Sequence, residues 1–70
     1  MYKSQPLSSL MTAIVDNHVA AASHHEDAAT FHRNAAAFYA NGHYPQANEQ
    51  AYLAINQGKQ AQEFCAMATE

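Results

Sequence analysis

Positive charge is scarce in this chain of 70 residues: only Lys3, Arg33 and Lys59 are basic, against six acidic residues. Nucleic-acid surfaces need clustered Lys and Arg, so the composition argues against nucleic-acid binding. A basic amphipathic helix lying on a membrane is disfavoured for the same reason. The sequence also has no run of about eighteen apolar residues, the length that a membrane-spanning helix needs. We therefore expect neither nucleic acid nor membrane as a partner.

Cysteine and catalytic motifs are equally sparse. Cys65 is the single cysteine, so no disulfide can form within the chain. The N-terminal stretch MYKSQPLSSLM contains no uninterrupted apolar segment of the kind that a secretion signal carries, and a cytoplasmic location is expected. We find no phosphate-binding loop, nucleophile motif or catalytic triad pattern, so we expect no enzymatic activity and no catalytic residue.

Alanine, with sixteen residues, is abundant and recurs with a period of seven. Three units, HVAAASH, HEDAATF and HRNAAAF, follow one another over residues 18–38, and each opens with His and carries an alanine pair. A strict heptad period without Pro or Gly predicts a long helix packed lengthwise on other helices. Alanine favours helix but offers little apolar area, so a small hairpin of this kind should need a partner.

One break interrupts the helical pattern, at Asn41-Gly42-His43-Tyr44-Pro45. Gly42 can take the left-handed conformation that ends a helix, and Pro45 can open the next helix. The sequence therefore predicts a single domain over residues 1–70, with one helix from about 6 to 41, a turn at 42–44 and a second helix from about 45 to 69. So short a turn makes the helices antiparallel neighbours. Tyr39 and Tyr44 flank the turn and are expected to pin it.

The second helix carries a line of small residues at alternating spacings of four and three. These residues are Ala47, Ala51, Ala54, Gly58, Ala61, Cys65 and Ala68. Such a line lets helix axes approach to about 8 Å, and the alanine stripe of the first helix is its natural partner. We interpret Gly58 as kept for close backbone approach and Cys65 as a core residue.

Larger apolar residues flank these lines, and we expect them to join two hairpins. The apolar face of the first helix spans about 160°, which is wide enough for two neighbouring helices. We therefore predict an all-α antiparallel hairpin that dimerises into a four-helix bundle. The predicted interface residues are Leu7, Leu10, Ile14, Phe31, Phe38, Leu53, Ile55 and Phe64.

The histidines are the candidates for chemistry. His18, His25 and His32 share a helix face but lie about 10.5 Å apart, too far for one helix to offer two of them to one metal ion. One interpretation is that the rings fill space beside the alanines and hydrogen-bond to Gln, Asn or Tyr of the facing helix. The alternative is a divalent metal site completed by the second helix or a second copy. The candidate metal ligands are His24, Asp27, His25, His32 and His18.

Residues 17–68 resemble small bacterial His- and Ala-rich helical hairpins, which occur alone or appended to ThiJ/PfpI-type proteins and are described as ferritin-like in fold. The matching segments are HHEDAA at 24–29, HRNAA at 32–36 and GHY at 42–44, followed by Ala47, Ala51 and Ala54. The resemblance implies a helical bundle. Ferritin-like di-iron proteins carry a Glu-x-x-His motif on two helices; this chain has none, so iron chemistry is not implied.

A second resemblance is to one tetratricopeptide repeat. It rests on Phe31, Ala35, Phe38, Gly42, Tyr44, Ala47, Ala51 and Ala54, whereas Asn34 and Lys59 depart from the repeat's usual Leu and Pro. The predicted helices are also about twice too long, and one copy forms no solenoid. We expect a structural or protein-interaction module whose partner is a second copy or an unidentified protein. The alternatives are a metal-binding ferritin-like bundle and a tetratricopeptide-like peptide-binding adaptor.

Overall fold

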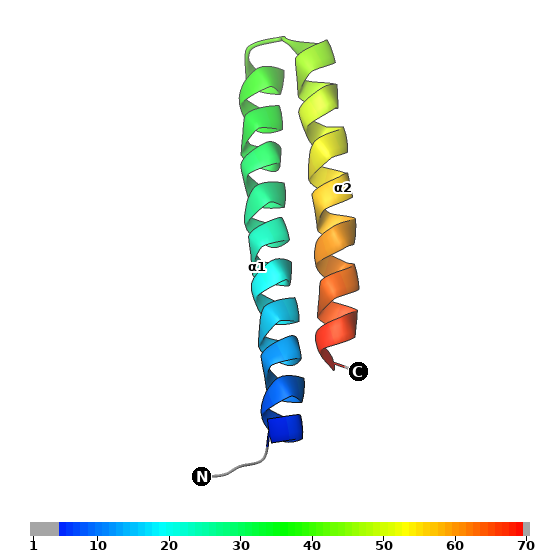
Figure 1. Cartoon of the computed structure of the whole chain (residues 1–70). Coiled ribbons are helices and arrows are strands. Elements are labelled where there is room, and N and C mark those ends of the chain that lie inside the picture. The colour runs from blue at the N-terminus through cyan, green and yellow to red at the C-terminus, as the bar shows by residue number, and fades with distance from the viewer. Residues whose placement is uncertain (1–4, 70) are drawn as a thin grey trace.

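The computed structural model describes the backbone of residues 5–69 and the side chains of residues 9–68. Two helices make up this part of the chain, α1 over Gln5–Ala40 and α2 over Tyr44–Thr69. They lie side by side in antiparallel directions (Figure 1), which confirms the predicted all-α hairpin. Helix α1 begins and ends one residue earlier than the sequence predicts, and α2 begins one residue earlier.

The turn between the helices ends α1 and pairs the carbonyls of Phe38 and Tyr39 in its last turn. Gly42 has a φ of 76°, the left-handed conformation in which glycine carries no steric cost. The N–H of His43 donates to the carbonyl of Phe38 at 2.9 Å, and the N–H of Gly42 donates to that of Tyr39 at 3.1 Å. This pair of bonds defines a Schellman motif. The carbonyl of His43 then accepts from the N–H of Ala47 at 2.9 Å, so α2 starts directly after the turn.

The contact between the helices is made by alanine. Every buried residue among the described side chains is an alanine, and within each helix these residues are seven positions apart. They are Ala21, Ala28 and Ala35 of α1 and Ala47, Ala54, Ala61 and Ala68 of α2. Because one heptad position recurs on both helices, the seven residues form a line along the hairpin, which we call the alanine line.

The structure corrects two expectations for α2. A Cβ atom added at Gly58 would meet nothing within 4 Å, so the predicted reason for this glycine, close backbone approach, is wrong within the hairpin. Cys65 is half-buried rather than part of the core. Both residues lie three positions from a buried alanine, beside the alanine line, where the two helix surfaces diverge. They belong to the surface that flanks the contact.

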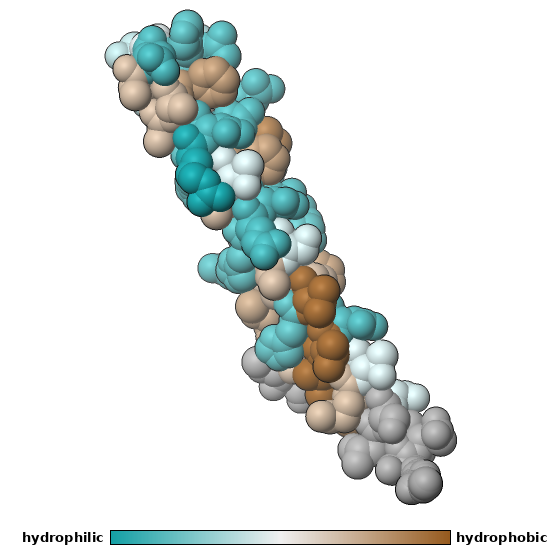
Figure 2. All heavy atoms as spheres, turned by 90° about the vertical axis from the view of Figure 1, so that its left-hand side faces the viewer, coloured by the Kyte–Doolittle hydropathy of each residue, from teal (hydrophilic) through white to brown (hydrophobic). Residues whose placement is uncertain are grey.

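The N-terminal part of α1 extends past the end of α2 (Figure 1). With 36 residues against 26, α1 is longer by 36 − 26 = 10 residues, which corresponds to about 15 Å of helix. Leu10 and Met11 in this part, and Val15 and Val19 in the turns that follow, are all more than half exposed. Figure 2, which faces the side of α1 turned away from α2, shows apolar surface gathered in this half of the helix. The hairpin therefore leaves large apolar side chains uncovered.

The importance of the alanine line can be tested by overfilling it. Ala54 is 1% exposed, so we predict that Ala54→Leu lowers the free energy of unfolding by about 2 kcal/mol or more, because the larger side chain forces the helices apart. Urea unfolding followed by circular dichroism measures this. Ala37→Leu, at an exposed position of α1, is the control and should change the value by less than about 0.5 kcal/mol. Equal effects of the two substitutions would contradict the role of the line.

Candidate functional site

The alanine line divides the surface of the hairpin into two broad faces. Residues one, three or four positions from a buried alanine, or from Ile14 at the same heptad position, fall to one side of the line or the other, and the contacts between helices join residues of the same side. The phenyl face includes Leu10, His24, Phe31, Asn34 and Phe38 of α1 with Gln50, Leu53, Gln57 and Phe64 of α2. The imidazole face includes Met11, Val15, His18, His25, His32 and Tyr39 of α1 with Tyr44, Ala51, Ile55, Gly58 and Cys65 of α2.

Polar groups on the phenyl face pair with one another across the two helices. Nδ1 of His24 lies 2.5 Å from Oε1 of Gln57, where a ring N–H donates to the amide oxygen. The same ring stacks on Phe64, with centroids 5.4 Å apart and planes 8° from parallel. Asn34 Nδ2 donates to Gln50 Oε1 at 3.2 Å. The predicted hydrogen bond from a histidine to a Gln of the facing helix is confirmed for His24.

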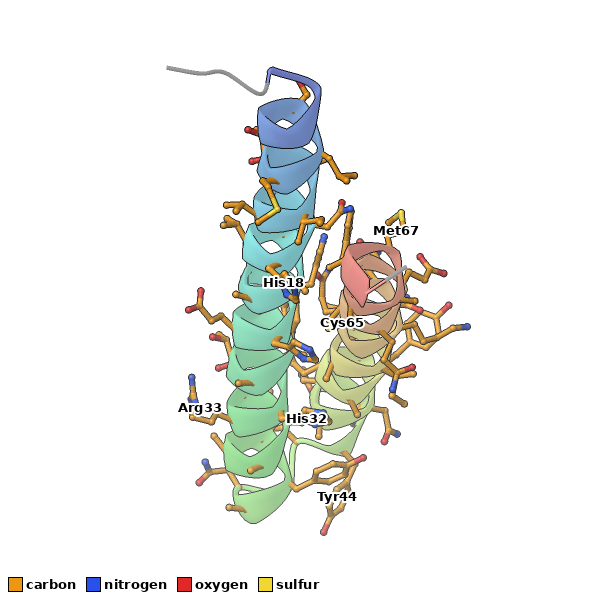
Figure 3. The ribbon with its side chains drawn as sticks, turned by 90° about the horizontal axis from the view of Figure 1, so that it is seen from below. His18, His32, Arg33, Tyr44, Cys65 and Met67 are labelled. Carbon is orange, nitrogen blue, oxygen red and sulfur yellow. The ribbon has the colours of Figure 1, made fainter. Side chains whose placement is uncertain are left out.

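Exposed imidazoles line the other face. His18, His25 and His32 are all exposed, and Figure 3 shows His18 and His32 reaching from α1 toward the side of α2 that carries Cys65, whereas Arg33 points away. Nε2 of His25 lies 3.8 Å from Sγ of Cys65, the reach of a weak hydrogen bond to sulfur. The two residues are 40 positions apart in sequence, so no local sequence pattern predicts that they lie close together.

Aromatic side chains hold the turn end of the hairpin, as predicted for Tyr39 and Tyr44. The hydroxyl of Tyr39 donates to Oδ1 of Asn48 at 2.5 Å, and its ring lies 6.2 Å from that of Tyr44. On the phenyl face, Phe38 meets the ring of His43 edge-on at a centroid distance of 6.2 Å. On both faces, contacts between aromatic rings therefore join the last turn of α1 to the residues at which the chain reverses.

The predicted metal ligands are distributed over both faces. His24 lies on the phenyl face with Asp27 at its margin, and the other three histidines lie on the imidazole face. Over residues 9–68, no three His, Cys, Asp or Glu side chains come together in a way that could hold a metal ion. A site within the described residues would thus need ligands from a second copy, as the sequence already suggested, and the metal site stays a prediction.

The predicted interface residues lie mainly on one face. Leu10, Phe31, Phe38, Leu53 and Phe64 are on the phenyl face, Ile55 is on the imidazole face, Ile14 continues the alanine line beyond Ala21, and the side chain of Leu7 lies outside the described residues. The interface stays a prediction. Sequence reasoning did not include Met11 and Val15 in the interface, although both are more than half exposed on the imidazole face. The available signal was that Met11 shares the heptad position of the three histidines.

Charged side chains keep to the outer sides of the two helices. Asp16, Glu26, Arg33, Glu49, Lys59 and Glu63 each lie two positions from a residue of the alanine line or of its continuation at Ile14. That spacing puts them about 200° around the helix from the contact. Asp27, at the margin of the phenyl face, is the exception. Among the described side chains, the imidazole face thus carries no Asp, Glu, Lys or Arg.

No protein-family model, curated protein or solved structure matches this chain. Within residues 5–69, neither helix combines the length and the apolar character needed to cross a membrane. The part of the chain that the structure describes forms no pocket. What it offers is two broad faces with different chemistry.

The contact between His24 and Gln57 should contribute measurably to the hairpin. We predict that His24→Ala and Gln57→Ala each lower the free energy of unfolding by about 1 kcal/mol. Because the two side chains share one hydrogen bond, the double variant should lose less than the sum, with a coupling of about 0.5–1 kcal/mol. Arg33→Ala, which removes an exposed side chain pointing away from α2, is the control. Strictly additive losses in urea unfolding would contradict the pairing.

Proposed function

We propose that this chain is a self-associating structural module, in which two hairpins pack face to face as a four-helix bundle without catalytic activity of their own. The observation that supports this function is the composition of the core. All seven buried residues of the described part are alanines, and a buried methyl group contributes only about 0.8 kcal/mol. The larger apolar side chains, which could contribute more, remain on the two faces.

The dimensions of the hairpin support the same proposal. Its radius of gyration is 17.1 Å, against about 11 Å for a compact chain of this length. Its accessible surface is 4917 Å², whereas a globular monomer of 7.7 kDa exposes about 4300 Å². The single hairpin therefore exposes about 600 Å² more than a compact monomer of its size. Packing against a second hairpin removes this excess.

A ferritin-like arrangement of the four helices and a cytoplasmic location belong to this proposal as predictions. A metal-dependent bundle is the second candidate function, and the proximity of His25 to Cys65 favours it. Imidazole nitrogen and thiolate sulfur are the usual ligands of zinc, and two copies would supply two of each. A tetratricopeptide-like adaptor would require an apolar groove for a peptide. Nothing in the described part of the chain favours such a groove, since that part forms no pocket.

Light-scattering mass tests self-association and its dependence on metal. After treatment with a chelator we expect a mass of about 15.4 kDa, twice the 7.7 kDa of one chain, because apolar packing holds the dimer together. Addition of zinc, nickel or ferrous iron should leave this mass unchanged, with less than one metal ion bound per dimer.

Two outcomes would contradict this expectation, and they differ. A mass of 7.7 kDa at every concentration, with or without metal, would refute self-association. A mass that doubles only when metal is added, and that fails to double in His25→Ala, would replace the apolar dimer by the metal-dependent bundle.

A further inference from the structure

The two faces differ in how completely the hairpin itself covers them. On the phenyl face, Phe31, Phe38, Leu53 and Phe64 are half-buried, Leu10 near the start of α1 is 57% exposed, and polar groups of that face pair across the helices as described above. On the imidazole face, the large apolar side chains are more exposed: Tyr44 by 59%, Ile55 by 58%, Val15 by 54% and Met11 by 53%. Covering the imidazole face with another pair of helices would therefore remove more apolar surface from water.

The imidazole face combines small and large side chains in a way that suits packing against another helix. Ala51, Gly58 and Cys65 form a low strip along α2, and the space where a Cβ of Gly58 would lie is open. Tyr44 stands higher at the turn end of this strip, at the same heptad position, and Ile55 stands higher beside it. Side chains that project next to small residues on the same surface are the elements of knobs-into-holes packing between helices.

The charge of the face favours a second copy as the occupant. Since the described side chains of this face include no Asp, Glu, Lys or Arg, two copies can meet there without burying an unpaired charge. A strongly acidic or basic partner would find no counter-charge to pair with. The same surface on both partners also gives the self-complementary contact that a twofold dimer needs.

The area of the imidazole face is sufficient for a stable interface between two copies. Helix α2 has 26 residues and is therefore about 39 Å long, and the hairpin is 18 Å wide. One face thus offers about 700 Å² per copy, or about 1400 Å² for two copies, within the range of about 1200–2000 Å² that stable interfaces bury.

We infer that the imidazole face, rather than the phenyl face, is the surface on which a second copy of this chain docks. His18, His25, His32 and Cys65 of both copies then lie in the interface. The inference rests on the proposed function and adds to it which face is covered. It also shifts the interface away from the phenylalanines, which the sequence pattern alone had favoured.

A matched pair of variants distinguishes the faces. Leu53 and Ile55 are two positions apart in α2, on either side of the buried Ala54, and they lie on opposite faces. We predict that Ile55→Asp raises the dimer dissociation constant at least tenfold, because it buries a carboxylate in the interface, whereas Leu53→Asp changes it less than threefold. Light-scattering mass over a dilution series gives both constants. The reverse order, or equal increases in both variants, would overturn the inference.

The wild-type chain offers a second readout that needs no variant. Cys65 is half-buried on the imidazole face, and its alkylation by iodoacetamide can be timed at concentrations below and above the dissociation constant. We expect the rate to fall at least fivefold in the dimer, because the second copy covers the thiol. A rate that stays constant while the mass doubles would overturn the inference. A mass that never doubles would instead refute the proposed function itself. If Ile55→Asp fails to fold, the alkylation rate alone decides.

Discussion

The line of alanines between the two helices is the constraint on which the rest of the structure depends. Methyl groups at Ala28 and Ala54 let the helices approach closely along most of their length. Alanine at the contact also limits the free energy that the contact contributes to folding. A buried methyl group contributes about 0.8 kcal/mol, whereas a buried Leu or Phe side chain contributes about 1.5–3 kcal/mol. The large apolar residues are left at the flanks, where only a further layer can bury them. A tight but weak contact of this kind is the physical reason for the association proposed above.

Much of the hairpin could be predicted because its signals are local. The heptad period places the alanines of α1 on one stripe, and the conformational freedom of Gly42 locates the reversal of the chain to within a residue. That an imidazole of α1 bonds to a polar side chain of α2 also follows from the pattern, without naming the pair, since small residues at the contact leave room for a ring beside them. None of these features depends on how α2 is rotated about its own axis.

What could not be predicted depends on that rotation. The small residues of α2 alternate at spacings of four and three, so the sequence is equally consistent with Ala54 or Gly58 facing α1. The structure places Ala54 at the contact and leaves Gly58 and Cys65 on the imidazole face. The proximity of Cys65 to His25 follows from this choice, as does the distinction between the two faces. Rotation is a property of the packed pair of helices, and a one-helix pattern cannot show it.

The distribution of charged side chains bears on the proposed packing of two hairpins. In an isolated hairpin, both faces beside the alanine line would be hydrated, and Lys or Glu there would be tolerated as at any exposed helix position. The described charges instead lie at positions such as Glu26 and Lys59, on the outer sides of the helices, and the imidazole face has none. The burial proposed for that face would penalise charge on it, since an unpaired charge is costly away from water. The arrangement is the one expected of a surface that is covered in the working protein, while the charged outer sides remain in water.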